Sequence, residues 1–337
     1  LPHTQTFQMK EVPSYVVLLF HSTDARDRLS LRGLGNISPG TFGELCVAIK
    51  QEFDVVSLRR FTELISAREA KQGRFLAVTF DDGPKSFALN AVHVLESLRM
   101  PSACFLITDC VGDKALYWRY LYNYCINAGF GRGLAALVSS EYNVPVKEQD
   151  MVSFTRSNFS SDKNRRIIKG ILGHLIAEEK YRENECELFL SSDDLRRLKD
   201  NPLITFGIHT CTHPVMKGLG NEELRNEISG SMDFYTENIE NASPMFSVPF
   251  GRLSRDYDER TVLSALDLSV SAIFSAYGGI NEKGQPLYNI RRIPVHEGLL
   301  EQGVDKFVRA LCKMEVGPEY REAEKRLREA VERRFLP

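Results

Sequence analysis

The 337-residue sequence has no apolar run long enough to span a bilayer, for which a helix needs about 20 residues, so we expect no membrane span. It also lacks the glycine-rich motifs that hold the phosphates of nucleotides and dinucleotides, which argues against chemistry based on such a cofactor. Short-period repeats and low-complexity segments are absent too. The chain is nevertheless long enough to bury a substantial core.

The cysteines are few and irregularly spaced. There are seven of them, with no Cys-x-x-Cys pair, which excludes a disulfide framework or a structural zinc ribbon and fits a reducing compartment. Residues 1–6 contain no signal-peptide core, so we expect a cytoplasmic protein, although a leader removed before residue 1 would leave no trace.

The net charge of −2, from 43 basic and 45 acidic residues, is too small to create a global field. A protein that binds nucleic acid or an anionic membrane through its overall charge would carry an excess of basic residues. We therefore expect neither partner.

Strand and helix patterns alternate through most of the chain. Short apolar runs without helical periodicity predict eight strands. They fall at residues 15–20, 54–58, 75–80, 103–107, 203–208, 245–252, 270–275 and 289–295. This order indicates an α/β fold dominated by parallel pairing, either a barrel or an open doubly wound sheet. Polar residues follow several strand ends, which favours a barrel, because parallel barrels gather catalytic groups there.

Two segments fall outside this alternation within what we expect to be a single domain, residues 1–337. Residues 110–190 predict a mainly helical insertion, which contains the aromatic segment 117–124 and the only tryptophan, Trp118. Trp118 is a candidate to stack on a sugar, but aromatics at these spacings more often form the core of their own segment, which we favour. Residues 317–337 predict a charged C-terminal helix that packs on the surface or supports a homo-oligomer.

Asp81 and Asp82 end an apolar strand, where two adjacent carboxylates would be unfavourable as core residues. Successive side chains diverge in a strand or tight turn, so one carboxylate could bind a metal while the other acts as a base. The simpler interpretation is a turn, in which Gly83 supplies a positive φ and Pro84 starts the next helix. The pair alone does not decide between them.

His209 and His213 follow another strand end in the same way. Two histidines separated by three residues can present both imidazoles to one metal ion, and a carboxylate completes a catalytic set with open positions. Asp82 is the natural third member. We therefore expect a divalent metal, with zinc preferred, on Asp82, His209 and His213.

At residues 79–83 (Thr-Phe-Asp-Asp-Gly) and 209–213 (His-Thr-Cys-Thr-His) the sequence resembles two motifs of the polysaccharide deacetylases, also called NodB-homology proteins or family 4 carbohydrate esterases. Residues 248–251 (Val-Pro-Phe-Gly) resemble the third motif. The resemblance spans roughly residues 16–298 without the insertion. It implies a distorted (β/α)7 barrel that hydrolyses acyl groups, usually acetyl, from sugars. It also implies that Asp81 is the general base and Asp82 a metal ligand.

The sequence departs from the family pattern at two places. Many members have an arginine two residues before the third-motif proline, which orients the base, whereas this chain has Ser247. Arg291 and Arg292 on the last strand are candidates to replace it, and since alternation lets only one face the interior, we prefer Arg292. The late Leu-x-His motif that supplies the general acid has no close match, and His296 is our candidate for this role.

Three further residues complete the expected site. We expect the backbone N–H of Phe250 to stabilise the oxyanion, with Pro249 beside it. His21 resembles a histidine of the first strand in some exopolysaccharide deacetylases, and a role in lining the site is as well supported as a structural one.

These residues predict a metal-dependent hydrolase that removes an N-acetyl group from an amino sugar in a poly- or oligosaccharide. The alternatives are deformylation or other hydrolysis of a non-peptide C–N bond in a small molecule, and a catalytically impaired carbohydrate-binding protein. The insertion would decide the substrate's size, because an open groove suits a polymer and a capped pocket suits a small glycoside or nucleotide sugar.

Overall fold

The computed structural model describes residues 13–69, 71–240 and 244–335. Two expectations concern residues outside these ranges: the missing signal-peptide core rests on residues 1–6, and the expected C-terminal helix includes residues 336 and 337. None of the described helices combines the length and the apolar composition that a bilayer-spanning helix requires.

Within the described residues, seven parallel strands close into a barrel, which confirms the predicted α/β barrel. They are β1 (Ser14–Phe20), β3 (Arg74–Phe80), β4 (Ser102–Leu106), β5 (Ile204–Ile208), β6 (Met245–Ser247), β7 (Ala272–Gly278) and β8 (Ile290–Pro294). β1 closes the ring because it pairs with both β3 and β8. β2 (Asp54–Val55) pairs with the start of β3 and stays outside the ring. It is shorter than predicted because Ser57 caps the next helix.

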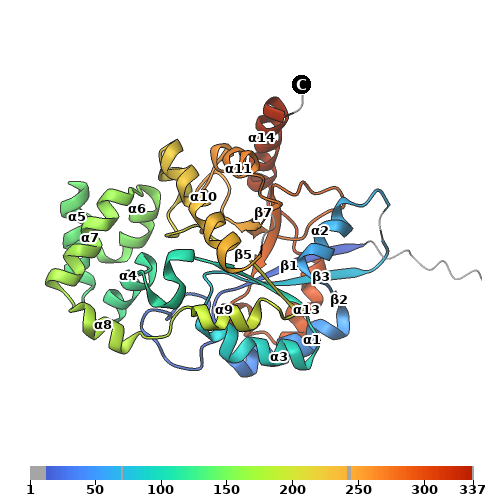
Figure 1. The fold of residues 1–337 in the computed structure, drawn as a ribbon, viewed down its shortest axis with the longest axis horizontal. Coiled ribbons are helices and arrows are strands. Elements are labelled where there is room, and N and C mark those ends of the chain that lie inside the picture. Colours follow the sequence, from blue (N-terminus) through green and yellow to red (C-terminus); the bar gives the residue numbers. More distant parts are fainter. Residues whose placement is uncertain (1–12, 70, 241–243, 336–337) are drawn as a thin grey trace, which may run out of the picture.

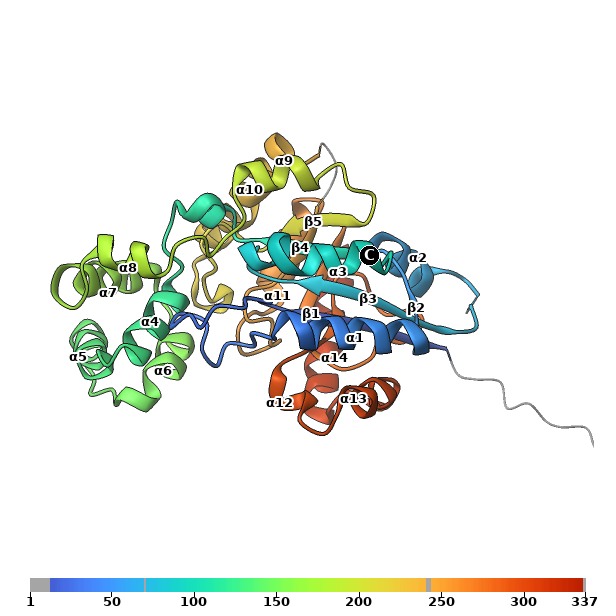
Figure 2. The same cartoon turned by 90° about the horizontal axis from the view of Figure 1, so that it is seen from below.

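Helices surround the barrel (Figures 1 and 2). They are α1 (Pro39–Glu52), α2 (Leu58–Ser66), the π-helical turn η1 (Phe87–Ala91) with α3 (Val92–Ser97), α9 (Ser192–Leu198), α10 (Asn221–Asn238), α11 (Glu259–Asp267), α12 (Glu297–Leu300), α13 (Val304–Ala310) and α14 (Pro318–Phe335). Polar caps fix several of their starts: the hydroxyls of Ser38, Ser57 and Ser191 each accept a backbone N–H of the first turn.

The segment between β4 and β5 forms a helical lobe on one side of the barrel, drawn in green in Figures 1 and 2. We use this name for the described helices α4 (Trp118–Asn127), α5 (Gly131–Tyr142), α6 (Met151–Ser157), α7 (Ser161–His174) and α8 (Glu178–Asn184). Within the lobe, α7 ends at His174 and a short connection leads to α8, which starts at Glu178.

The barrel interior is apolar at one end and polar at the other. Tyr15, Phe75 and Phe105 belong to one interior cluster, which also takes in Phe61 of α2 at the end where the strands begin. Near the carboxyl ends of the strands the buried interior residues are polar and include Thr79, Asp81, Ser247 and Arg292. The alternation of the strands thus brings chemistry-bearing side chains to one end of the barrel.

Arg291 faces outward from β8 and joins the barrel to α14. Its Nε and Nη2 donate to the Glu324 carboxylate at 2.8 and 2.6 Å. Asn289 also donates to this carboxylate, at 2.8 Å. Both partners of the ion pair are largely buried, with side-chain exposures of 7% and 14%. Removal of Glu324 would therefore leave the nearly buried Arg291 with only the exposed Glu282, at 3.6 Å, as an ionic partner.

We predict that Glu324→Ala lowers the free energy of unfolding by about 2–4 kcal/mol, because Arg291 loses its carboxylate. Glu322→Ala on the same helix is the matched control, since Glu322 and its partner Arg326 are 59% and 70% exposed. Its effect should stay below about 0.5 kcal/mol. Urea unfolding measures both, and equal effects would show that Glu324 does not anchor the helix.

Candidate active site

Three loops at the carboxyl ends of the strands position the expected catalytic residues. Asp81 and Asp82 follow β3, His209 and His213 follow β5, and Phe250 follows β6. The β5 loop is held by backbone hydrogen bonds to the β4 end, from His209 N to Leu106 O at 2.8 Å and from Thr108 N to Thr210 O at 3.1 Å. The separate sequence motifs therefore meet in space.

The backbone of these loops is strained where the side chains must turn toward one another. Asp82, His213 and Phe250 have positive φ values of 72°, 58° and 57°, which non-glycine residues rarely adopt. The next residue after Phe250 must be glycine, because a Cβ on Gly251 would lie 2.3 Å from the backbone nitrogen of Ala276. Such strain is concentrated at functional sites.

Asp82, His209 and His213 form a compact buried cluster that could hold a metal ion, with all three ligand atoms within 4.8 Å of one another. Asp82 Oδ1 lies 3.5 Å from Nε2 of each histidine. The ligand atoms of a tetrahedral zinc site lie about 3.4 Å apart, so these separations suit such an ion. Asp82 Oδ1 is also buried without a hydrogen-bond partner in the described structure. A divalent cation would satisfy this orphaned oxygen.

The electrostatics of the site also favour a cation. Burial opposes ionisation of both carboxylates. Arg292 and His209 outweigh it and lower the pKa of Asp81, and His209 and His213 outweigh it and lower the pKa of Asp82. Burial opposes protonation of His209 as well, yet the two carboxylates raise its pKa. Burial and the charge of His209 lower the pKa of His213 to about 3, so His213 is neutral, as a metal ligand must be.

Side chains at the start of α4 orient the three candidate metal ligands. The Tyr117 hydroxyl lies 3.0 Å from His213 Nδ1, and the Tyr120 hydroxyl donates to Asp82 Oδ2 at 3.2 Å. Trp118 Nε1 donates to the backbone oxygen of His213 at 3.1 Å. Hydrogen bonds of this kind fix the direction in which metal-ligating side chains point.

Asp81 lies beside this cluster, with its Oδ2 3.8 Å from Nε2 of His209, and its carboxylate is bound by Arg292. The Arg292 Nη1 and Nη2 donate to the two carboxylate oxygens at 2.8 and 2.7 Å. The other donors of the guanidinium reach Ser275 O at 2.6 Å, Thr79 Oγ1 at 3.2 Å and Ser247 Oγ at 2.7 Å. All five N–H groups of this fully buried arginine are thus engaged. The Ser247 hydroxyl donates to Asp81 as well, at 3.0 Å.

A cavity of about 350 Å³ opens onto the two aspartates and the two histidines. His21, Phe250 and Pro294 line it from the barrel side, and Tyr117 and Arg119 line it from the helical lobe. The barrel and the helical lobe therefore both contribute to the wall of this cavity.

Three expected site residues lie elsewhere. His296 is exposed and lines a neighbouring hollow, which shares His21 and Pro294 with the cavity. Trp118 is 2% exposed and packs against Phe250, so it offers no stacking face to a sugar, and the core interpretation fits its surroundings. Pro249 is buried and does not line the cavity. Packing behind the third-motif loop buries both Trp118 and Pro249, and neither lines the cavity.

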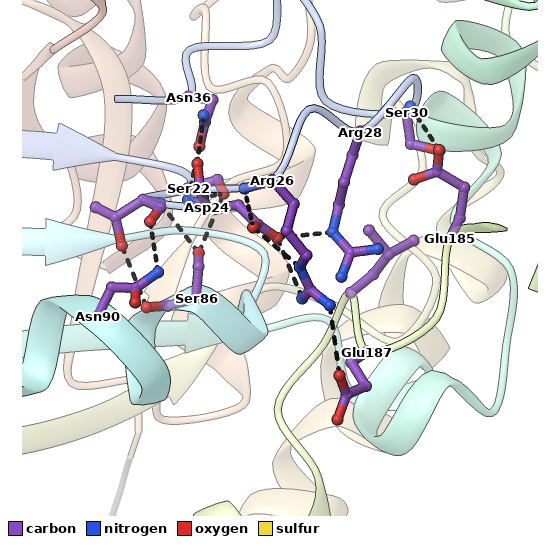
Figure 3. A network of polar contacts seen from close by, with 12 residues as sticks. Ser22, Asp24, Arg26, Arg28, Ser30, Asn36, Ser86, Asn90, Glu185 and Glu187 are labelled. Carbon is purple, nitrogen blue, oxygen red and sulfur yellow. Dashed lines mark hydrogen bonds and ion pairs between the residues drawn. The ribbon is translucent and has the colours of Figure 1, made fainter. Parts of the chain in front are cut away.

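The loop that carries His21 is fixed by a polar network, shown in Figure 3. Asp24 accepts hydrogen bonds from Nε of Arg28 at 2.7 Å and from Nε of Arg26 at 3.2 Å. Arg26 also reaches Glu187, which follows the helical lobe in the chain, at 3.5 Å. This network ties the cavity wall on the His21 side to the segment that connects the lobe to β5.

The family model of the polysaccharide deacetylases matches residues 68–271, more than half of the chain. The chain belongs to the polysaccharide deacetylase family. This membership implies a hydrolase that acts on amide or ester bonds of acylated carbohydrates. Among proteins of curated function, no match is found.

Solved structures of deacetylases share the fold. The deacetylase PplD from Streptococcus pyogenes, in complex with acetate, is 13% identical, with a TM-score of 0.59 over 88% of this chain and 98% of its own. IcaB from Ammonifex degensii is 16% identical, with a TM-score of 0.58 over 88% and 97%. A polysaccharide deacetylase from Bacillus cereus is 17% identical, with a TM-score of 0.54 over 88% and 69%. At sequence identities this low, the similarity to these structures shows a shared fold only.

Several cavity residues escaped the sequence analysis, namely Tyr117, Arg119, Tyr120, Arg156 and Tyr277. The aromatic segment 117–124 carried a signal for Tyr117 and Tyr120, because residues three apart lie on one face of a helix. Arg156 and Tyr277 carried no signal. Each is far from a motif in the chain, and folding alone brings it to the site.

We predict that the purified protein binds one divalent metal ion and that His209→Ala weakens this binding by more than about 100-fold, because a direct ligand is lost. His174→Ala is the matched control, since His174 is an exposed histidine at the end of α7. Metal analysis after dialysis against a chelator measures both. Equal metal retention in the two variants would exclude His209 as a ligand.

Proposed function

We propose that this polysaccharide deacetylase is a metal-dependent hydrolase that removes the N-acetyl group from an amino sugar. The observation that carries the proposal is the division of the adjacent carboxylates, with Asp81 held by Arg292 and Asp82 turned toward two histidines. Together they supply a base and a metal position in one cavity.

Zinc is the metal that we propose for Asp82, His209 and His213. One carboxylate and two imidazoles suit a catalytic site that leaves positions open for water and substrate. A divalent ion bound there would polarise the acyl carbonyl and lower the pKa of a water molecule.

Asp81 is the general base in this proposal. Its lowered pKa keeps it ionised at neutral pH, and Arg292 and Ser247 fix the direction of its carboxylate. It would take a proton from the attacking water as the oxygen bonds to the acyl carbon. The backbone N–H of Phe250, at the cavity wall, is our candidate donor to the oxyanion.

His21 is the general acid that the cavity supports best. It is half-buried and lines the cavity directly, together with Asp81 and Asp82. His296, the candidate from the sequence, lies outside this cavity. An amide nitrogen leaves poorly as an anion, so His21 as imidazolium would protonate it while the C–N bond breaks.

The structure bears on two of the alternative functions that the sequence left open. A catalytically impaired binding protein was suggested by the arginine missing at Ser247, but Arg292 supplies a guanidinium to Asp81 from another strand. The helical lobe contributes Tyr117 and Arg119 to the cavity wall, which favours a small glycoside, or the end of a chain, over the middle of a polymer. A formyl group would fit the same chemistry, so acetate and formate release should be measured together.

We predict that Asp81→Asn lowers kcat by about 10² to 10⁴, because the amide cannot accept the proton, while metal content stays near wild type. His209→Ala should lose both activity and metal. Acetate release from N-acetylated amino sugars and metal analysis of the same samples measure the two effects, with a thermal melt to verify folding. Equal metal loss in both variants would make Asp81 a ligand and refute the division of roles.

We also predict that His21→Gln lowers the rate on an N-acetyl sugar by at least about 100-fold, yet has a much smaller effect on 4-nitrophenyl acetate, whose phenolate leaves without a proton. His296→Gln is the matched control and should keep both activities. The opposite result, with the loss confined to His296→Gln, would return the acid role to His296.

A further inference from the structure

The helical lobe places two arginines, Arg119 and Arg156, in the wall of the active-site cavity. Arg156 is neutralised by Asp256, to which its Nε and Nη2 donate at 2.6 and 2.5 Å. Its guanidinium also lies 4.5 Å from the centre of the Phe250 ring. Arg156 therefore has a complete structural explanation.

Arg119 has no such explanation. In the described part of the chain its guanidinium forms no hydrogen bond or ion pair, and its Nη1 is buried without any partner. Burial lowers the pKa of Arg119, and the charge of Arg156 lowers it further. An arginine stays protonated under these conditions, so the cavity wall holds an uncompensated positive charge. Arg119 is half-buried and its Nη1 is enclosed, and an enclosed donor of a charged group is unfavourable unless an anion or another acceptor satisfies it.

The neighbouring hollow shows that unpaired arginines are not a general feature of this region. Arg26 and Arg28 both pair with Asp24, and Arg32 pairs with Asp27. Arg119 differs from these described arginines in having no carboxylate beside it and in facing the active-site cavity.

The position of Arg119 determines which part of a bound substrate its guanidinium could contact. It lies between Tyr117 and Tyr120, whose hydroxyls contact His213 and Asp82. An anion on Arg119 would therefore lie close to the acyl group, within the same sugar unit or at its first linkage. The planar fork of a guanidinium matches the oxygens of a phosphate or carboxylate in two parallel hydrogen bonds.

We propose that Arg119 binds an anionic group of the substrate, so that the natural substrate is an N-acylated amino sugar that carries a phosphate or a carboxylate next to the acylated unit. This inference rests on the proposed function and adds the charge of the substrate to it. Arg119 contacts substrate in this account and determines specificity.

The test compares three compounds: methyl N-acetylglucosaminide, which is neutral, N-acetylglucosamine 1-phosphate and N-acetylmuramic acid, which carries a carboxylate. For the wild type, kcat/KM should be at least about tenfold higher on one of the charged compounds, and which one distinguishes phosphate from carboxylate. Arg119→Met should abolish this preference. Arg119→Lys should restore part of it, because the charge returns without the bidentate geometry.

Arg132→Met is the matched control, since Arg132 is an exposed arginine of α5 in the same lobe, and it should keep the wild-type preference. Binding of the same compounds to the Asp81→Asn variant, with and without Arg119→Met, is measured by calorimetry. Turnover with equal kcat/KM on all three compounds, or an equal loss on all three in Arg119→Met, would overturn the anion site and leave the proposed function standing. Arg119-dependent binding of the charged compounds without turnover of any would support the anion site and overturn the proposed function.

Discussion

The ion pair between Arg292 and Asp81 connects four strands across the polar end of the barrel. Arg292 extends from β8, and its donors reach Ser275 on β7, Ser247 on β6, and Thr79 and Asp81 on and after β3. A charge in this interior must be paired, since an isolated ion there is strongly unfavourable. The pairing therefore fixes both the end of the barrel and the aim of a carboxylate that we propose as the base.

This pairing leaves Asp82 free for a different task. With Asp81 turned to Arg292, the positive φ of Asp82 directs its side chain toward His209 and His213. The helical lobe contributes further side chains to the site. The hydroxyls of Tyr117 and Tyr120, at the start of α4, orient the candidate metal ligands, and Arg119 places an unpaired charge in the cavity wall. Barrel and lobe thus divide the proposed chemistry and the proposed recognition between them.

Much of the barrel and its motifs could be predicted from the sequence, because both depend on local patterns. Apolar runs marked the strands, and strand alternation indicated that only one of Arg291 and Arg292 could face the interior. The placement of His296 could not be predicted, since chain order does not tell which strand end opens into the cavity. The lobe residues Arg119 and Arg156 were missed because their roles arise from packing between distant segments.

The central claim is that Arg292 acts through Asp81, and a double-mutant cycle on kcat tests it most directly. Arg292→Lys keeps the charge but loses the bidentate grip, so we expect it to lower kcat of the wild type by about 10- to 100-fold. In the Asp81→Asn background the same substitution should change kcat by less than about twofold, because the base that it positions is already gone. An equal loss of kcat in both backgrounds would contradict the account.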